Sequence, residues 1–169
     1  PVPLAKTAEE NMPLHIERSV TGAQQDRVSI ALGNVISAQL QRRKDGAQMV
    51  IERGNVSLGG SAAEPERRGV WVSGSLNNLD LDHWLALSRS SPAGGVRIEL
   101  AGLDVKFGAV EVFSRRFNEL AISGSAQGGN WQTALVGREL VGEVAWRPQG
   151  KGKVIARMKN LVIPAVIPG

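Results

Sequence analysis

The stretch that decides the fold is GSLNNLDLDHWLALSRSSP, Gly74 to Pro92, because it interrupts the pattern of the rest of the chain. On either side, apolar and polar residues alternate. Within it, Leu81, Trp84 and Leu85 recur at the spacing that places residues on one face of a helix. The stretch therefore predicts one short α-helix in a chain that otherwise predicts strands.

The predicted helix has plausible signals at both ends. Asp80 or Asp82 can cap its start by accepting a hydrogen bond from a backbone N–H, and Ser91-Pro92 can end it. A helix of about two to three turns is too short to be stable alone. We therefore expect a helix over about residues 80–89 that packs on a sheet as a lid through its three apolar residues.

Alternation with a period of two dominates the remaining sequence. Val28, Ile30 and Leu32 alternate with polar or small residues, and the same pattern recurs in later segments separated by Gly-rich turns. Such alternation is typical of antiparallel strands with one buried face. We predict about ten to twelve strands in a mostly β fold. The expected architecture is a long, twisted and curved antiparallel sheet, as a β-groove or an open barrel or sandwich, with the helix packed on it.

The alternation changes phase once. The apolar residues Val96, Ile98 and Leu100 occupy even positions, whereas Leu103, Val105 and Phe107 occupy odd ones. A slip of one residue would turn every later side chain to the other face, so a bulge or a sharp bend is expected at Ala101-Gly102.

The chain of 169 residues has the length of one domain. We expect an extended lead-in over residues 1–13, a single β-rich domain over 14–164 that includes the helix, and a tail over 165–169. No apolar run is long enough for a membrane-spanning helix. The sequence begins at Pro1 without a signal peptide, so we expect a piece of a longer protein.

Catalytic and metal-binding signatures are missing from the sequence. The chain has no cysteine and two histidines, His15 and His83, and the common hydrolase, zinc-protease and nucleotide-binding motifs are absent. The net charge of +4 is scattered through the alternating segments. It fits a nucleic-acid or lipid patch less well than solvated strand ends. We expect no enzyme activity, no cofactor, no metal and no nucleic-acid partner.

Two segments carry a resemblance to a known family. They are VSGSLNNLDLDHWLAL and the later run GLDVKFGAVEVFSRRFNELAISGSAQGGNWQTALVGRELVGEVAWRPQGKGKVIARMKNLVIP. Their order and spacing resemble those of the AsmA-like envelope proteins, especially the large YhdP branch. The resemblance covers Val70 to Pro164 well and the first 60 residues only in style.

The resemblance implies a non-enzymatic role in the bacterial envelope. Such proteins are anchored in the inner membrane by one N-terminal helix, lie mostly in the periplasm and form long β-structures with an apolar groove. They are thought to bridge the envelope, carry phospholipid between the inner and outer membranes and support the outer-membrane permeability barrier. This chain would be an internal or C-terminal periplasmic section. Its implied partners are phospholipid acyl chains and neighbouring β-segments of the same longer chain.

An apolar sheet face must be covered by a second layer or by a ligand. One short helix cannot cover ten or more strands, so either the sheet folds on itself into a closed core or part of its apolar face stays open for acyl chains. The candidate groove residues are Val96, Ile98, Leu100, Leu103, Val105, Phe107, Leu120, Ile122, Val144 and Trp146, and the lid residues are Leu81, Trp84 and Leu85. The alternative is a closed β module that acts as a spacer or a protein-docking surface.

Overall fold

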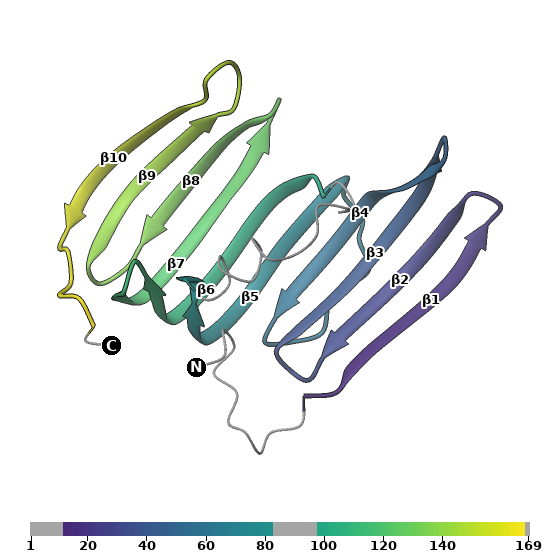
Figure 1. Ribbon diagram of the computed structural model, residues 1–169, viewed down its shortest axis with the longest axis horizontal. Helices are drawn as coiled ribbons and strands as arrows, with labels where there is room; N and C mark the ends of the chain where they lie inside the picture. The colour runs from purple at the N-terminus through teal and green to yellow at the C-terminus, as the bar shows by residue number, and fades with distance from the viewer. Residues whose placement is uncertain (1–11, 83–97, 168–169) are drawn as a thin grey trace. The chain divides into compact units, whose positions relative to one another are not determined.

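The computed structural model describes residues 12–82 and 98–167. Most of these residues lie in ten strands (Figure 1). The strands are β1 (Leu14–Gly22), β2 (Gln25–Leu32), β3 (Ile36–Asp45), β4 (Gln48–Leu58), β5 (Gly69–Asp80), β6 (Leu100–Val112), β7 (Arg115–Gln127), β8 (Asn130–Val136), β9 (Leu140–Arg147) and β10 (Lys153–Leu161). The prediction of a mostly β fold is confirmed.

The strands follow one another across the sheet in chain order, from β1 to β10. Since β1 and β10 each have one neighbour in this order, the sheet is open and not closed into a barrel. One feature departs from the antiparallel prediction: β5 pairs with β4 in parallel. The ten residues between them return the chain to Arg53 in the middle of β4, and the polar composition of this loop gave no sign of that crossing.

The chain divides into two compact units. One, here called the β1–β4 unit, comprises Asn11–Gly74 and Ala93–Leu103. It therefore includes β1 to β4, the first half of β5 and the first four residues of β6. The other, the β7–β10 unit, comprises Pro1–Glu10, Ser75–Pro92 and Asp104–Gly169. The single domain expected over residues 14–164 stays a prediction.

In the β1–β4 unit, the loop between β4 and β5 lies against polar side chains of the sheet. The Asn55 amide donates to the backbone oxygens of Ala63 and Glu64, and Arg27 pairs with the Glu64 carboxylate at 2.7 Å. The Ser37 hydroxyl accepts the Ala62 N–H and donates to the Gly60 oxygen. Polar residues of these strands therefore face the loop.

The change of phase coincides with the start of β6. Ile98 and Glu99 precede the strand, which begins at Leu100, so the even-numbered apolar row does not form a strand through Ile98 as predicted. Gly102 is buried, and the Trp71 ring occupies the space a side chain there would need, 2.2 Å from an ideal Cβ. The Arg67 guanidinium lies 3.6 Å from the centre of the same ring.

In the β7–β10 unit, a two-residue turn joins β6 and β7. Phe113 and Ser114 both have positive φ, 51° and 53°, as type I′ hairpin turns require. An Asn-Gly pair adopts these angles far more readily than Phe-Ser. The two carboxylate oxygens of Asp82 accept the backbone N–H groups of Phe113 and Ser114, each at 2.8 Å. Asp82 therefore binds this turn, and of the two predicted helix caps, Asp80 and Asp82, only Asp80 directly precedes the helical residues.

Glu139 fixes a second irregular point of the β7–β10 unit. Its carboxylate accepts hydrogen bonds from the backbone N–H and the side-chain amide of Asn118, both at 2.7 Å. These bonds, led by that of the Asn118 side chain, hold the pKa of Glu139 below its usual value. The next residue, Glu119, has a positive φ of 53°, so the bonds anchor β7 where its backbone departs from a regular strand.

Leu81 and Asp82 are helical, at the position where the predicted helix begins. Trp84 and Leu85, which carry the lid prediction, lie outside the described residues, as do His83 and Val96. The lid therefore stays a prediction.

Replacing Gly102 with alanine should destabilise the protein by about 1–3 kcal/mol, the usual cost of forcing an extra methyl group into filled space. The added Cβ would collide with the Trp71 ring. Gly22→Ala is the matched control, since nothing lies within 4 Å of its ideal Cβ. Urea unfolding measures the free energy of unfolding of both variants. Equal values for Gly102→Ala and Gly22→Ala would contradict the close packing of Gly102 against Trp71.

Replacing Phe113-Ser114 with Asn-Gly should stabilise the protein by about 1–2 kcal/mol, because these residues adopt positive φ at lower cost. Asp82→Ala should have the opposite effect, since it removes the acceptor of both turn N–H groups. Thermal unfolding of the two variants tests the turn. A double variant that is less stable than the parent would show that the Phe113 side chain contributes more than its backbone conformation costs.

Candidate functional site

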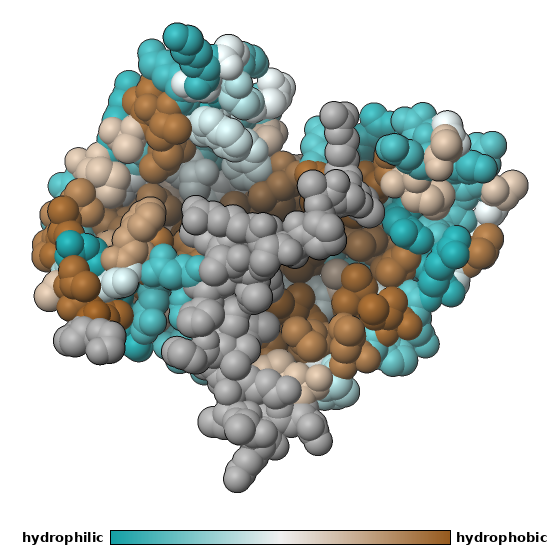
Figure 2. Space-filling model, viewed as in Figure 1, coloured by the Kyte–Doolittle hydropathy of each residue, from teal (hydrophilic) through white to brown (hydrophobic). Residues whose placement is uncertain are grey.

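The β1–β4 unit presents one apolar face. Residues paired directly across neighbouring strands point to the same side of a sheet, so the register defines cross-strand rows. Three rows are almost entirely apolar: Leu14–Leu32–Ile36–Leu58, Ile16–Ile30–Ala38–Val56–Val72 and Arg18–Val28–Leu40–Gly54–Val70. In Figure 2, hydrophobic side chains gather on the visible face of this unit.

Most side chains of this face remain partly exposed. Val28, Ala38 and Val70 are buried, but Ile30 and Leu40 are only half-buried, and Leu14 and Ile16 of the edge strand β1 are about 60% exposed. Among the residues that the structure describes, no large side chain is fully buried. The opposite side carries the polar residues and the loop described above. The apolar face of this unit is thus buried at Val28, Ala38 and Val70 and open along its edge strand β1.

A cluster of three charged residues ends the apolar rows. The fourth row consists of Val20, Asp26, Arg42 and Ile51, and the third row contains Arg18. Arg42 donates to both carboxylate oxygens of Asp26, through Nε at 2.8 Å and Nη2 at 2.6 Å, and the Nε of Arg18 donates to Oδ2. Asp26 is only 2% exposed, whereas the side chains of Arg42 and Arg18 are 22% and 60% exposed.

The arginines determine the charge state of this cluster. The hydrogen bonds from Arg42 hold the pKa of Asp26 below its usual value, against burial, which acts to raise it, and the bond from Arg18 adds to the lowering. The same hydrogen bond raises the pKa of Arg42. At neutral pH, Asp26 is a carboxylate and both arginines are cationic.

The β7–β10 unit also has an apolar face. Its rows include Ile122–Leu135–Gly142–Met158, Gly124–Thr133–Val144–Ala156 and Ala126–Trp131–Trp146–Val154. Several of these side chains are well exposed, with Trp146 at 47% and Val154 at 66%. As in the β1–β4 unit, the described residues bury the apolar face of this unit only in part.

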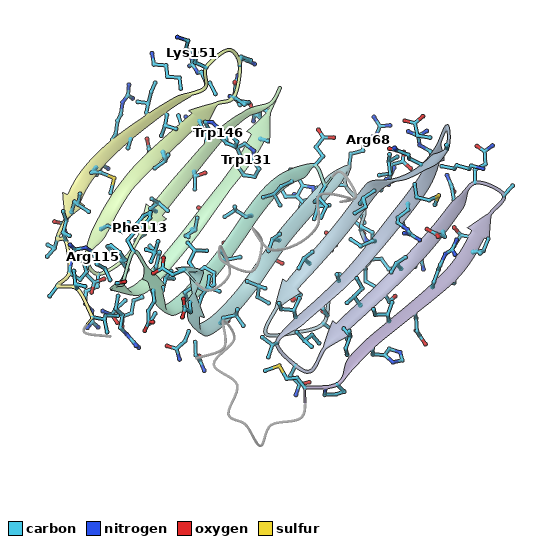
Figure 3. The ribbon with its side chains drawn as sticks, viewed as in Figure 1. Arg68, Phe113, Arg115, Trp131, Trp146 and Lys151 are labelled. Atoms are coloured by element: carbon cyan, nitrogen blue, oxygen red, sulfur yellow. The ribbon has the colours of Figure 1, made fainter. Side chains whose placement is uncertain are left out.

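Two tryptophans mark one end of that face. Trp131 and Trp146 pair directly across β8 and β9, and Figure 3 shows them at the same end of the unit as the Lys151 turn. Arg147 follows Trp146 and pairs with Lys153. Aromatic rings that carry a polar N–H suit an interface between apolar and aqueous surroundings, whereas Arg147 and Lys153 point to the opposite face.

The structure separates the predicted groove residues. Ile122, Val144 and Trp146 lie on one face of the β7–β10 unit. Val105, Phe107 and Leu120 are buried in the same unit. Leu100 and Leu103 are half-buried in the β1–β4 unit, and Ile98, which is 63% exposed, precedes its strand. Val96 lies outside the described residues.

Sequence reasoning missed the charged cluster and the rows of β1 to β4. A signal was present: Arg18, Asp26 and Arg42 occupy positions that the alternation assigns to apolar residues of their strands. Each looks like an isolated exception, and only the register brings the three together. Within residues 12–82 and 98–167, no group of acidic and histidine side chains could hold a metal ion, and no helix is both long and apolar enough to cross a membrane.

Asp26→Asn should destabilise the protein by about 3 kcal/mol at pH 7. That is the lower end of the range for a broken buried ion pair, because Arg42 keeps some access to water. Since the pKa of Asp26 is lower folded than unfolded, its contribution is complete above about pH 4 and disappears as the pH falls through the folded value. Denaturant unfolding at several pH values should therefore show the two proteins converging in acid.

The matched control is Glu64→Gln, which removes an exposed carboxylate that pairs with a single arginine. Its effect should stay below about 1 kcal/mol, as for other surface ion pairs. If Asp26→Asn lowers the free energy of unfolding by no more than this control does, the cluster contributes little to folding.

Comparison with known proteins identifies the family. The family model described as YhdP protein matches residues 1–168, nearly the whole chain. Searches of the curated proteins and of the solved structures each found no match. The family match agrees with the resemblance seen in the strand and turn motifs, and the chain therefore belongs to the YhdP family.

Proposed function

We propose that this chain is a non-enzymatic section of an envelope protein that binds phospholipid through the apolar faces of its sheet. In this proposal, acyl chains lie on the open rows, and the longer protein carries phospholipid between the inner and outer membranes. The section lies in the periplasm, as part of a protein anchored in the inner membrane. The role implied for AsmA-like proteins and the family membership support this placement.

The observation that carries the proposal is the exposure of the apolar rows. In the β1–β4 unit, most aliphatic side chains of three consecutive rows stay half-buried or exposed, although Val28, Ala38 and Val70 are buried. The polar face is lined by a loop. Each CH₂ group that such a surface removes from water contributes about 0.8 kcal/mol. A chain of a dozen carbons would therefore be held firmly even where only half of it is in contact.

The alternative function, a closed spacer or docking module, fits the fold less well. The strand order runs from β1 to β10 without returning, so the sheet does not enclose its apolar residues as a barrel would. Docking of another protein on the same face is an outcome that the following experiment can reveal.

Native mass spectrometry of the purified protein should detect bound phospholipid. Ile16→Asp places a charge in an exposed apolar row of β1 and should lower lipid retention at least tenfold, because the carboxylate would have to leave water beside an acyl chain. Folding should be preserved, since Ile16 is 60% exposed.

The matched control is Ser19→Asp, which adds the same charge on the other face of the same strand. It should retain lipid like the parent. A parent protein that carries no phospholipid and binds none on addition would contradict the proposal, as would equal retention by the two variants.

A further inference from the structure

We propose that Arg18 and Arg42, positioned by Asp26, bind the phosphate of a phospholipid headgroup whose acyl chains lie on the adjoining apolar rows. This inference rests on the proposed function and deepens it, since it assigns a place and an orientation to the lipid. Phospholipid binding alone requires only an apolar surface. The charged cluster adds a chemical group that recognises one end of the molecule.

The position of the cluster fits this role. Arg18 lies on the same side of the sheet as Ile16, two residues along β1, and Arg42 is placed likewise with respect to Leu40 on β3. Successive rows on one face are about 7 Å apart, so the two apolar rows beyond that of Arg18 extend about 14 Å away from it. A phosphate held by the arginines would thus have apolar side chains beside it in one direction along the strands.

The charge of the cluster also fits. Two guanidinium groups and one carboxylate give a net charge of +1, which matches the single negative charge of a phosphodiester. The opposing residues of the fourth row, Val20 and Ile51, are apolar and supply no competing carboxylate. Lys44, paired with Met49 one row further on, adds a third cationic side chain on the same side.

Donors remain available for a ligand. Asp26 accepts from the Nε and Nη2 of Arg42 and from the Nε of Arg18. Within the described part of the chain, the other terminal nitrogens of these two guanidinium groups make no hydrogen bond or ion pair. Guanidinium groups bind phosphate oxygens in paired geometry, and Arg18, 60% exposed, can present both of its terminal nitrogens.

Asp26 acts as a positioning residue in this site. Because it is 2% exposed and bonded to both atoms of one edge of Arg42, it fixes the plane of that guanidinium. A group fixed before binding loses less conformational freedom when the ligand arrives. The Asp26–Arg42 pair alone would satisfy the buried carboxylate, so the additional, largely exposed Arg18 is the residue that a ligand explains best.

The experiment compares three probes by titration calorimetry with the full chain: dioctanoyl phosphatidylglycerol, dioctanoylglycerol and inorganic phosphate. The two lipids have the same acyl chains and differ in the phosphate headgroup. The parent should bind the phospholipid at least tenfold more tightly than dioctanoylglycerol, and inorganic phosphate only weakly. Arg18→Gln should lower the affinity for the phospholipid about tenfold and leave that for dioctanoylglycerol unchanged.

Arg43→Gln is the matched control. Arg43 follows Arg42 on β3 and points to the face opposite the proposed site, so the substitution removes the same charge outside that site. It should leave the preference for the phospholipid intact. Equal binding of the two lipids by the parent, or an equal loss in the two variants, would overturn the headgroup site while lipid binding stood. Phosphate binding as tight as that of the phospholipid would overturn it in favour of a free-anion site. Failure to bind either lipid would contradict the proposed function itself.

Discussion

The structure depends on one constraint: a strand with a period of two must commit every second residue to the same face. When strands pair in register, those residues form continuous rows, and rows of aliphatic residues require cover. In each of the two units, the described residues supply that cover only in part, as the exposure of Ile16 and Trp146 shows. The buried hydrophobic residues of the described chain, such as Val70 and Phe107, are accordingly few, and no large side chain among the described residues is fully buried.

Much of the fold could be predicted from this constraint alone. Alternation located the strands, and Gly-rich turns located most of the hairpins, because both signals are local. The parallel pairing of β4 and β5 could not be predicted, since a polar loop of ten residues can return the chain to either end of a strand. The role of Asp82 could not be predicted either, because its partners, Phe113 and Ser114, are some thirty residues away in sequence and a local pattern does not reveal them.

The candidate site was harder to predict than the fold. Alternation identifies apolar residues but not which of them share a row, so buried positions such as Val105 and Phe107 were grouped with exposed ones such as Trp146. The charged cluster shows the same limit. Arg18, Asp26 and Arg42 each interrupt an apolar pattern on a separate strand, and their meeting is a property of the register of β1, β2 and β3.

Stability alone does not account for charges at these positions. A buried ion pair gains in mutual attraction about what it loses in hydration, and apolar residues of similar volume often stabilise a protein as well or better. With aliphatic residues at 18, 26 and 42, the apolar surface would continue through the fourth row without a charged boundary. With the charges in place, the apolar surface ends at a fixed point where a buried carboxylate orients an arginine and a second arginine reaches solvent. A surface that ends in this way distinguishes the two ends of an amphipathic molecule, which a uniformly apolar face cannot do.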